Sequence, residues 1–136
     1  MFYVAYISIS LYSNEKDVEW HMNTEVSIDL QRASQLLKLL GDPTRLKMMK
    51  LLKSHECCVC EFVEIFKMSQ PAISQHLRKL RDIALVKEER RGQWIFFSIN
   101  EQHEDYPFVK SILEHLPEQN EVITELEAQG LRVCCE

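Results

Sequence analysis

The five cysteines of this chain stand in two tight clusters, and their thiols are the side chains best suited to chemistry. One cluster holds Cys57, Cys58 and Cys60, and the other holds Cys134 and Cys135. This spacing is a poor framework for disulfides that join distant parts of a fold, so reduced thiols in a cytoplasmic protein are the more natural expectation. Soft thiolates select thiophilic ions such as arsenite, antimonite, cadmium or lead, whereas carboxylates and water suit magnesium or calcium. All five cysteines are therefore candidate ligands of such an ion.

The spacing of the first cluster sets a geometric condition on that role. On a regular helix, residues two apart point about 200° away from each other, so Cys58 and Cys60 share an ion only where the helix is distorted. Cys57 and Cys60 are three apart and would lie on the same side. Neighbouring cysteines can also oxidise or form polysulfide links, which leaves a redox- or persulfide-sensing function open. The plainer alternative is three small buried apolar residues.

The segment after this cluster has the pattern of two helices joined by a short turn. Apolar side chains between residues 62 and 66 predict a short amphipathic helix, and residues 67–69 have the length of a helix-turn-helix turn. Ser69 is a natural N-cap for the second helix, and Pro71 suits its first turn. A helix-turn-helix is therefore expected directly after the thiols.

The second helix carries side chains that suit double-stranded DNA on its polar face. Its apolar residues Ile73, Leu77 and Leu80 fall together and can be buried, which leaves the opposite face for a partner. Glutamine suits adenine, small residues allow close approach, and arginine or lysine suits guanine or phosphate. The candidate DNA-binding residues of this segment are Ser69, Gln70, Ala72, Ser74, Gln75, His76, Arg78 and Lys79. The alternative is an ordinary helical hairpin with a solvated polar face.

A β-hairpin is predicted next. Residues 83–89 begin a strand, Arg90, Arg91 and Gly92 form a basic turn, and residues 94–99 are aromatic and β-branched. A hairpin directly after a recognition-like helix has the position of a wing. Arg90 and Arg91 are therefore also candidate DNA-binding residues, placed to contact phosphate or the minor groove.

Composition indicates one domain with a local basic surface. The chain has 136 residues, 46% hydrophobic and 27% charged, which is enough for one compact domain and short for two. Its formal net charge is −5, yet residues 69–92 hold six basic against three acidic residues. The positive charge is thus concentrated on the predicted DNA-binding segment.

Helices are also expected on either side of this centre. Residues 27–40 form a broad apolar surface that stops at Gly41, and Pro43 begins a second helix. After the hairpin, residues 107–116 and a final stretch running to Gly130 are helical. The excess apolar surface of the first and last helices predicts a homodimer.

The expected fold is mainly α with a small β-hairpin, a winged helix-turn-helix. Residues 1–22 would be an N-terminal extension, residues 23–117 the DNA-binding and sensing domain, and residues 118–136 a C-terminal helix and cysteine-bearing tail. Residues 2–12 are apolar but far shorter than a membrane span, so no membrane partner is expected. An enzyme is not expected, because the chain has no glycine-rich phosphate loop and no acid pair or nucleophile with a base at motif spacing.

Three motifs carry a family resemblance: GDPTRLKMMKLL, ECCVCEFVEIFKMSQPAISQHLRKL and RRGQWIFFSIN, in this order. Across residues 27–116 they resemble the ArsR/SmtB family of winged-helix metal-sensing repressors. The resemblance implies a homodimer that binds operator DNA and releases it when a toxic metal or metalloid binds. Arsenic, cadmium and lead sensors of this family carry a Cys-Val-Cys just ahead of the recognition helix, which here is Cys58-Val59-Cys60. Arsenite or another thiophilic ion is the implied inducer, and arsenic resistance the implied role.

The chain also departs from the family pattern. Val63 stands where arsenic sensors have a third cysteine, so the candidate third ligands are Cys57, Cys134 and Cys135. Other branches bind zinc on the last helices; Glu101 and His103 fit the start of that site, but its continuation meets Glu114 and Pro117. We expect Cys58 and Cys60 to be essential, Cys57 to contribute, and removal of residues after Gly130 to leave the response largely intact.

Overall fold

The computed structural model of the protein describes residues 28–132. Cys134, Cys135 and the expected extension over residues 1–22 lie outside the described residues. The elements in chain order are α2 (Leu30–Leu40), α3 (Pro43–Ser54), β1 (Cys57–Cys58), α4 (Val59–Phe66), α5 (Gln70–Asp82), β2 (Val86–Arg91), β3 (Trp94–Ile99), α6 (Tyr106–Glu114) and α7 (Asn120–Ala128). This mainly helical order with one small antiparallel sheet confirms the predicted fold class.

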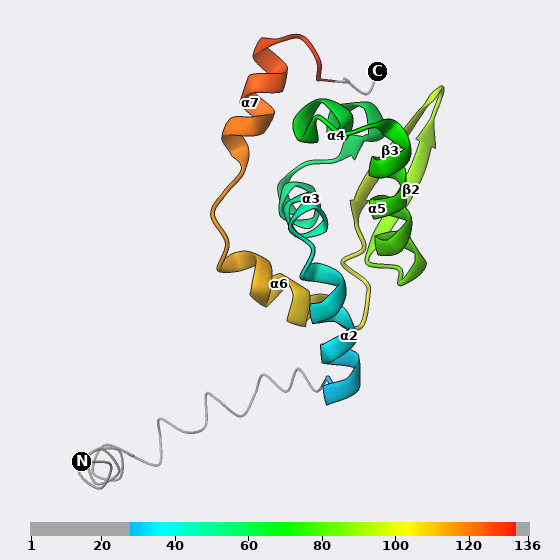
Figure 1. Cartoon of the computed structure of the whole chain (residues 1–136), viewed down its shortest axis with the longest axis vertical. Helices are drawn as coiled ribbons and strands as arrows, with labels where there is room; N and C mark the ends of the chain where they lie inside the picture. Colours follow the sequence, from blue (N-terminus) through cyan, green and yellow to red (C-terminus); the bar gives the residue numbers. More distant parts are fainter. Residues whose placement is uncertain (1–27, 133–136) are drawn as a thin grey trace, which may run out of the picture.

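Helix α3 occupies the middle of the molecule (Figure 1). Helix α5 and the β2–β3 hairpin lie on one side of it, and the segment from α6 to α7 runs along the other. The core is built from the apolar faces that the sequence pattern indicated, including Met48 and Met49 of α3, Phe62 of α4 and Leu77 of α5, all at most 1% exposed. Helix α5 packs against both α3 and α4, so this core fixes where the recognition-like helix stands.

Side chains cap the starts of α3 and α5, and the cap of α5, Ser69, is the one that the sequence predicted. The Asp42 side chain accepts a hydrogen bond from the Arg45 amide at 3.0 Å, and Ser69 accepts one from the Ala72 amide at 3.4 Å. A proline follows each cap within the first two helical positions. Lys67 adopts a left-handed conformation, with φ 52°, in the turn between α4 and α5. The helix-turn-helix prediction is confirmed.

The hairpin is present, but its turn lies two residues further along the chain than expected. Arg90 and Arg91 belong to β2, where Arg91 pairs with Trp94, and the turn is formed by Gly92 and Gln93. Gly92 has φ 62°, a backbone conformation that favours glycine. The strand also begins later, at Val86, because α5 continues to residue 82 before the chain turns.

A third strand was not predicted. Cys57 and Cys58 pair with Phe97 and Phe96, which adds β1 to the hairpin in the order β1-β3-β2. A two-residue strand has no alternating pattern of its own, because its pairing depends on a segment about forty residues away. The first thiol cluster is thus partly in a sheet and only partly in a helix.

Helix α7 packs against α4 through Ile123 and Leu126, both at most 4% exposed. These two residues are therefore buried within the chain, and pairing of the C-terminal helices with a second copy stays a prediction. Among the described helices, none has the length and apolar character needed to cross a membrane.

Candidate thiol sensor and DNA interface

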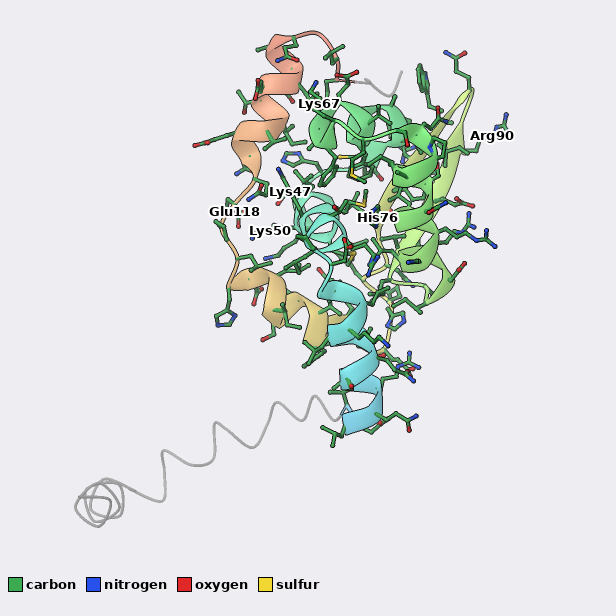
Figure 2. All side chains as sticks on the ribbon, in the orientation of Figure 1. Lys47, Lys50, Lys67, His76, Arg90 and Glu118 are labelled. Atoms are coloured by element: carbon green, nitrogen blue, oxygen red, sulfur yellow. A yellow bond between two sulfur atoms is a disulfide. The ribbon has the colours of Figure 1, made fainter. Side chains whose placement is uncertain are left out.

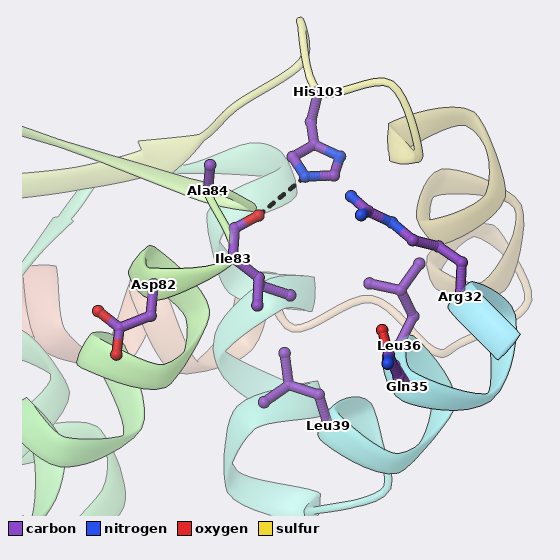
Figure 3. A pocket seen from close by; sticks show the side chains of 8 residues that line it. All are labelled: Arg32, Gln35, Leu36, Leu39, Asp82, Ile83, Ala84 and His103. Carbon is purple, nitrogen blue, oxygen red and sulfur yellow. Dashed lines mark hydrogen bonds between the residues drawn. The ribbon is translucent and has the colours of Figure 1, made fainter.

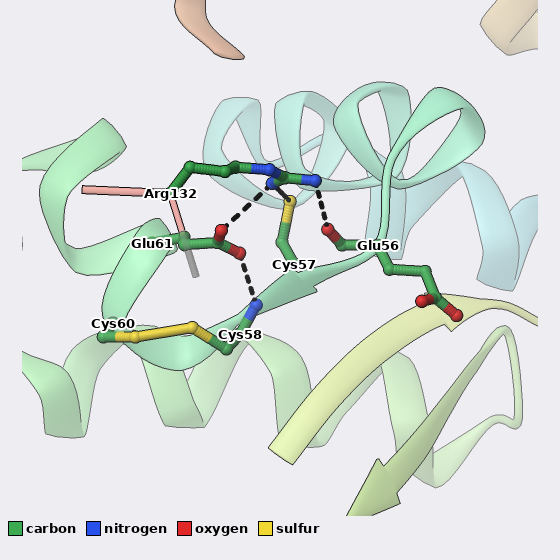
Figure 4. Close-up of a disulfide and its surroundings, with 6 residues drawn as sticks. All are labelled: Glu56, Cys57, Cys58, Cys60, Glu61 and Arg132. Atoms are coloured by element: carbon green, nitrogen blue, oxygen red, sulfur yellow. Dashed lines mark hydrogen bonds and ion pairs between the residues drawn. A yellow bond between two sulfur atoms is a disulfide. The ribbon is translucent and has the colours of Figure 1, made fainter. Parts of the chain in front are cut away.

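Cys58 and Cys60 are joined by a disulfide, and their Cα atoms lie 5.5 Å apart (Figure 4). Cys58 is the N-cap of α4 and has an extended backbone, with φ −93° and ψ 168°, whereas Cys60 lies in the first turn of the helix. The two sulfurs converge because only one of them is on the helix. The condition set by the sequence, that Cys58 and Cys60 can share a ligand only where the helix is not regular, is met because the helix begins after Cys58. The expectation of reduced thiols in the cell stays a prediction.

Cys57 points away from this pair. Adjacent strand residues project to opposite faces, so the Cys57 thiol lies on the other side of β1 from the disulfide, as Figure 4 shows. It is fully buried, and this burial, together with the Glu61 carboxylate, raises the pKa of the Cys57 thiol to about 12. Within residues 28–132, no group of three His, Cys, Asp or Glu side chains is placed to hold a metal ion. The predicted same-side arrangement of Cys57 and Cys60 is incorrect.

Glu61 organises the turn that carries the disulfide. Its carboxylate, with a fully buried side chain, accepts a hydrogen bond from the Cys58 amide at 2.8 Å. The same carboxylate accepts from Arg132 Nη1 at 3.1 Å. Neither residue was singled out from the sequence. A local signal for Glu61 was present, because an acidic residue three positions after an N-cap is the pattern of a capping box.

A hollow of about 250 Å³ opens beside the Cys58–Cys60 pair. Its wall is formed by Val59, by Gln70 at the start of α5, and by hairpin residues that include Trp94 and Ile95. The start of α5 and the tip of the hairpin therefore both border the hollow beside these two cysteines.

The polar face of α5 is open to a partner. Ile73, Leu77 and Leu80 are buried, as predicted, and the exposed candidates for DNA binding on this segment are Ser69, Gln70, Ser74, Gln75, Arg78 and Lys79, with Ala72 partly exposed. His76 differs from these residues, because its ring turns toward the start of α3 (Figure 2). Its Nδ1 lies 3.4 Å from Arg45 Nη1 and 3.8 Å from Asp42 Oδ1. His76 therefore connects α5 to the start of α3 on the side away from the exposed polar face.

The two wing arginines have different surroundings. Arg91 binds both carboxylate oxygens of Glu56, at 2.9 and 3.2 Å, and Glu89 at 2.8 Å. Its guanidinium also lies 4.9 Å from the centre of the Phe96 ring. Arg90 projects outward from the hairpin (Figure 2), where its Nε donates to the Gly92 carbonyl at 3.2 Å. Arg91 thus ties the wing to the residue before Cys57, and Arg90 faces solvent.

The possible zinc site is replaced by hydrogen bonds. His103 Nδ1 accepts from the Asp105 amide at 3.0 Å, so its Nε2 donates to the Ile83 carbonyl at 2.8 Å. This ring lines a pocket of about 620 Å³ between α2 and the end of α5 (Figure 3). His55 and His115 occupy the C-caps of α3 and α6. These three histidines therefore have structural partners.

Similarity to known proteins agrees with this geometry. Residues 42–88 match the family described as bacterial regulatory protein, arsR family. The arsenical resistance operon repressor of Staphylococcus xylosus is 38% identical over 73 residues, which span 54% of this chain and 70% of that protein. The transcriptional repressor PagR of Bacillus anthracis is 35% identical, with a TM-score of 0.53 over 65% of this chain and 95% of PagR. Reduced HlyU from Vibrio cholerae is 29% identical, with a TM-score of 0.53 over 71% of this chain and 90% of HlyU.

A helix-turn-helix with an open polar recognition face, followed by a wing, defines a winged-helix DNA-binding regulator. The chain belongs to the ArsR/SmtB family of DNA-binding transcriptional repressors.

Proposed function

We propose that this repressor releases its operator when a thiophilic metalloid or metal ion, arsenite above all, binds the thiolates of Cys58 and Cys60. The observation that carries the proposal is the convergence of these two sulfurs beside a hollow lined by the recognition helix and the wing. A pair of thiolates selects soft ions over magnesium or calcium. Arsenite takes three thiolates in protein sites, and because Cys57 faces away, the candidates for the third are Cys134 and Cys135.

Release of the operator follows from the contacts made by the turn that carries Cys58 and Cys60, here called the thiol turn. Cys58 pairs with Phe96 of β3, whose ring packs under Arg91, and Arg91 binds Glu56 just ahead of the cysteines. Helix α4 begins at the turn and packs directly on α5. A ligand that draws the sulfurs into new bonds moves β1 and the first turn of α4, and therefore changes the relative placement of wing and recognition helix.

The repressor acts on DNA as a homodimer in this proposal. Leu30 and Leu37 on α2 have 87% and 51% of their surface exposed, which is unusual for leucines on an amphipathic helix. A second copy covering this face would present two recognition helices to an operator. Light scattering should give twice the chain mass at micromolar concentration, and Leu37→Glu should shift the protein toward monomer and weaken operator binding.

The proposal is tested by operator release under reducing, anaerobic conditions. Arsenite, antimonite, cadmium, lead and zinc are each titrated against the protein bound to a fluorescent operator. Cys58→Ser and Cys60→Ser should bind DNA normally and lose the response, and the Cys134→Ser/Cys135→Ser double variant measures the contribution of the tail. A Cys58→Ser/Cys60→Ser protein that arsenite still releases from DNA would refute the assignment.

A redox- or persulfide-sensing repressor is the second candidate, and the Cys58–Cys60 disulfide favours it. Oxidation of the two thiols removes two electrons and two protons and joins the sulfurs in the same turn. Oxidant or polysulfide would then release the operator without any metalloid. If arsenite fails under reducing conditions while polysulfide succeeds in the same assay, this second function is the correct one.

A further inference from the structure

Arg132 joins the end of the described chain to the thiol turn. Its Nη1 lies 3.1 Å from Glu61 Oε1 and 3.7 Å from Cys57 Sγ, and its Nη2 donates to the Glu56 carbonyl at 3.0 Å (Figure 4). These partners are 71 to 76 residues away in sequence. Gly130, with φ 68°, ends the last helical segment and turns the chain back toward α4. The C-terminal segment is thus fastened to the residues around the sensor.

The contact with Glu61 is the important one, because the Glu61 side chain is fully buried. A buried carboxylate requires charged or hydrogen-bonding partners. Arg132 supplies the positive charge at one oxygen, and the other oxygen accepts from the Cys58 amide at 2.8 Å. Arg132 therefore holds Glu61 in place, and Glu61 in turn holds the backbone of Cys58 in the extended conformation that brings its sulfur to Cys60.

We propose that Arg132 is a positioning residue of the thiol sensor: its clamp on Glu61 sets how readily Cys58 and Cys60 close on one thiophilic ligand or form a disulfide. The inference rests on the proposed role of the Cys58–Cys60 pair. It also changes the expectation for the tail, because a chain cut after Gly130 loses this clamp as well as Cys134 and Cys135. The effect of such a truncation would not report on the tail cysteines alone.

Guanidinium geometry distinguishes Arg132 from a simple positive charge. The planar fork reaches Glu61, the Cys57 sulfur and the Glu56 carbonyl at once, which one ammonium group cannot reproduce. Arg132→Gln should therefore remove the whole constraint that Arg132 places on Glu61 and the Cys58 backbone. Arg132→Lys should restore part of the effect, because it keeps the charge beside Glu61.

Two dithiol reactions measure the effect in the full chain, with Cys134→Ser and Cys135→Ser in all proteins so that the tail thiols do not react. Cys57, the third remaining thiol, is buried, and repeating the titrations with Cys57→Ala in every protein isolates the sensor pair. In the first, the dithiol reduces glutathione disulfide to two glutathione molecules and becomes a disulfide. In the second, phenylarsine oxide forms two As–S bonds and releases one water. We expect Arg132→Gln to lower both equilibrium constants about tenfold, equivalent to about 30 mV for the two-electron couple. Alkylation of the reduced protein by iodoacetamide needs one thiol at a time and should change little.

Controls separate positioning from general loss of structure. Lys110→Gln removes an exposed charge of α6, whose ion pair with Glu114 is long at 3.9 Å, and should leave both constants unchanged. Glu61→Gln keeps an acceptor for the Cys58 amide but loses the charge, so adding Arg132→Gln to it should have little further effect. Circular dichroism confirms that each variant is folded before titration.

Unchanged constants in a folded Arg132→Gln variant would overturn the inference, as would effects of Arg132→Gln and Glu61→Gln that simply add. Both outcomes are distinct from failure of the proposed function, because these titrations contain no DNA. The proposed function is tested separately by operator release in Cys58→Ser and Cys60→Ser.

Discussion

Replacing Arg90 with glutamine should flatten the salt dependence of operator binding, whereas the same change at the adjacent Arg91 should not. Arg90 points outward from the hairpin, and among the described residues no carboxylate forms an ion pair with it. Arg91 is engaged by Glu56 and Glu89. A phosphate can therefore recruit Arg90 without breaking an existing ion pair, but recruiting Arg91 would first dismantle the anchor of the wing.

The two substitutions should change different quantities: Arg90→Gln the salt dependence of binding, and Arg91→Gln the affinity itself. Removing one arginine that binds phosphate reduces the slope of log K against log salt by about 0.9, so binding of an Arg90→Gln protein falls less steeply between about 50 and about 200 mM salt. The Arg91 ion pairs are partly solvent-exposed, and such pairs contribute about 0.2 to 1 kcal/mol, with a similar amount from the interaction with the Phe96 ring. Arg91→Gln should therefore weaken binding roughly thirtyfold at most, by a similar factor at every salt concentration.

Fluorescence anisotropy with a labelled operator, repeated over a salt series, separates the two effects. Arg81→Gln provides a matched exposed arginine whose partner Glu88 lies at 3.0 Å. An Arg91→Gln protein with a slope reduced as much as that of Arg90→Gln would show that Arg91 contacts phosphate and that its ion pairs do not hold in the complex.

Three further predictions concern buried or capping groups. Cys57 has a folded-state pKa of about 12, above its ordinary 9.0. Unfolding measurements should therefore show the wild-type protein losing stability relative to Cys57→Ala as pH rises from 9.0 to about 12. The Cys57→Ala protein should still release the operator in response to arsenite. The pKa of Asp42 is lowered, mainly by the Arg45 amide, so Asp42→Ala should cost about 1 kcal/mol at neutral pH in urea unfolding, and the difference should shrink as pH falls below 3.8. Lys50 is buried, and its ammonium group donates to the Leu113 carbonyl at 3.0 Å and to the Glu118 carboxylate at 2.7 Å (Figure 2). Thermal unfolding should show Lys50→Ala destabilised by roughly 1–3 kcal/mol. Lys50→Met should be destabilised by less, because methionine retains the packing of the aliphatic part of the lysine side chain.

The sequence by itself determined the helices, the turn of the helix-turn-helix and the presence of a wing. These features depend on neighbours a few residues apart. Ser69 caps α5 through an amide three residues away, and Ile73, Leu77 and Leu80 share a face because of the helical repeat. The polar recognition face follows from the same periodicity.

Only the tertiary structure decided how the thiols are arranged. Pairing of Cys58 with Phe96 places one cysteine of the pair in a strand, and this makes two sulfurs converge that a continuous helix would separate. The partners of Arg91 and Arg132 lie 35 and 71 residues away, at Glu56 and Glu61. No local pattern encodes such contacts, because a charged side chain has many possible partners in the sequence and packing of the whole chain selects among them.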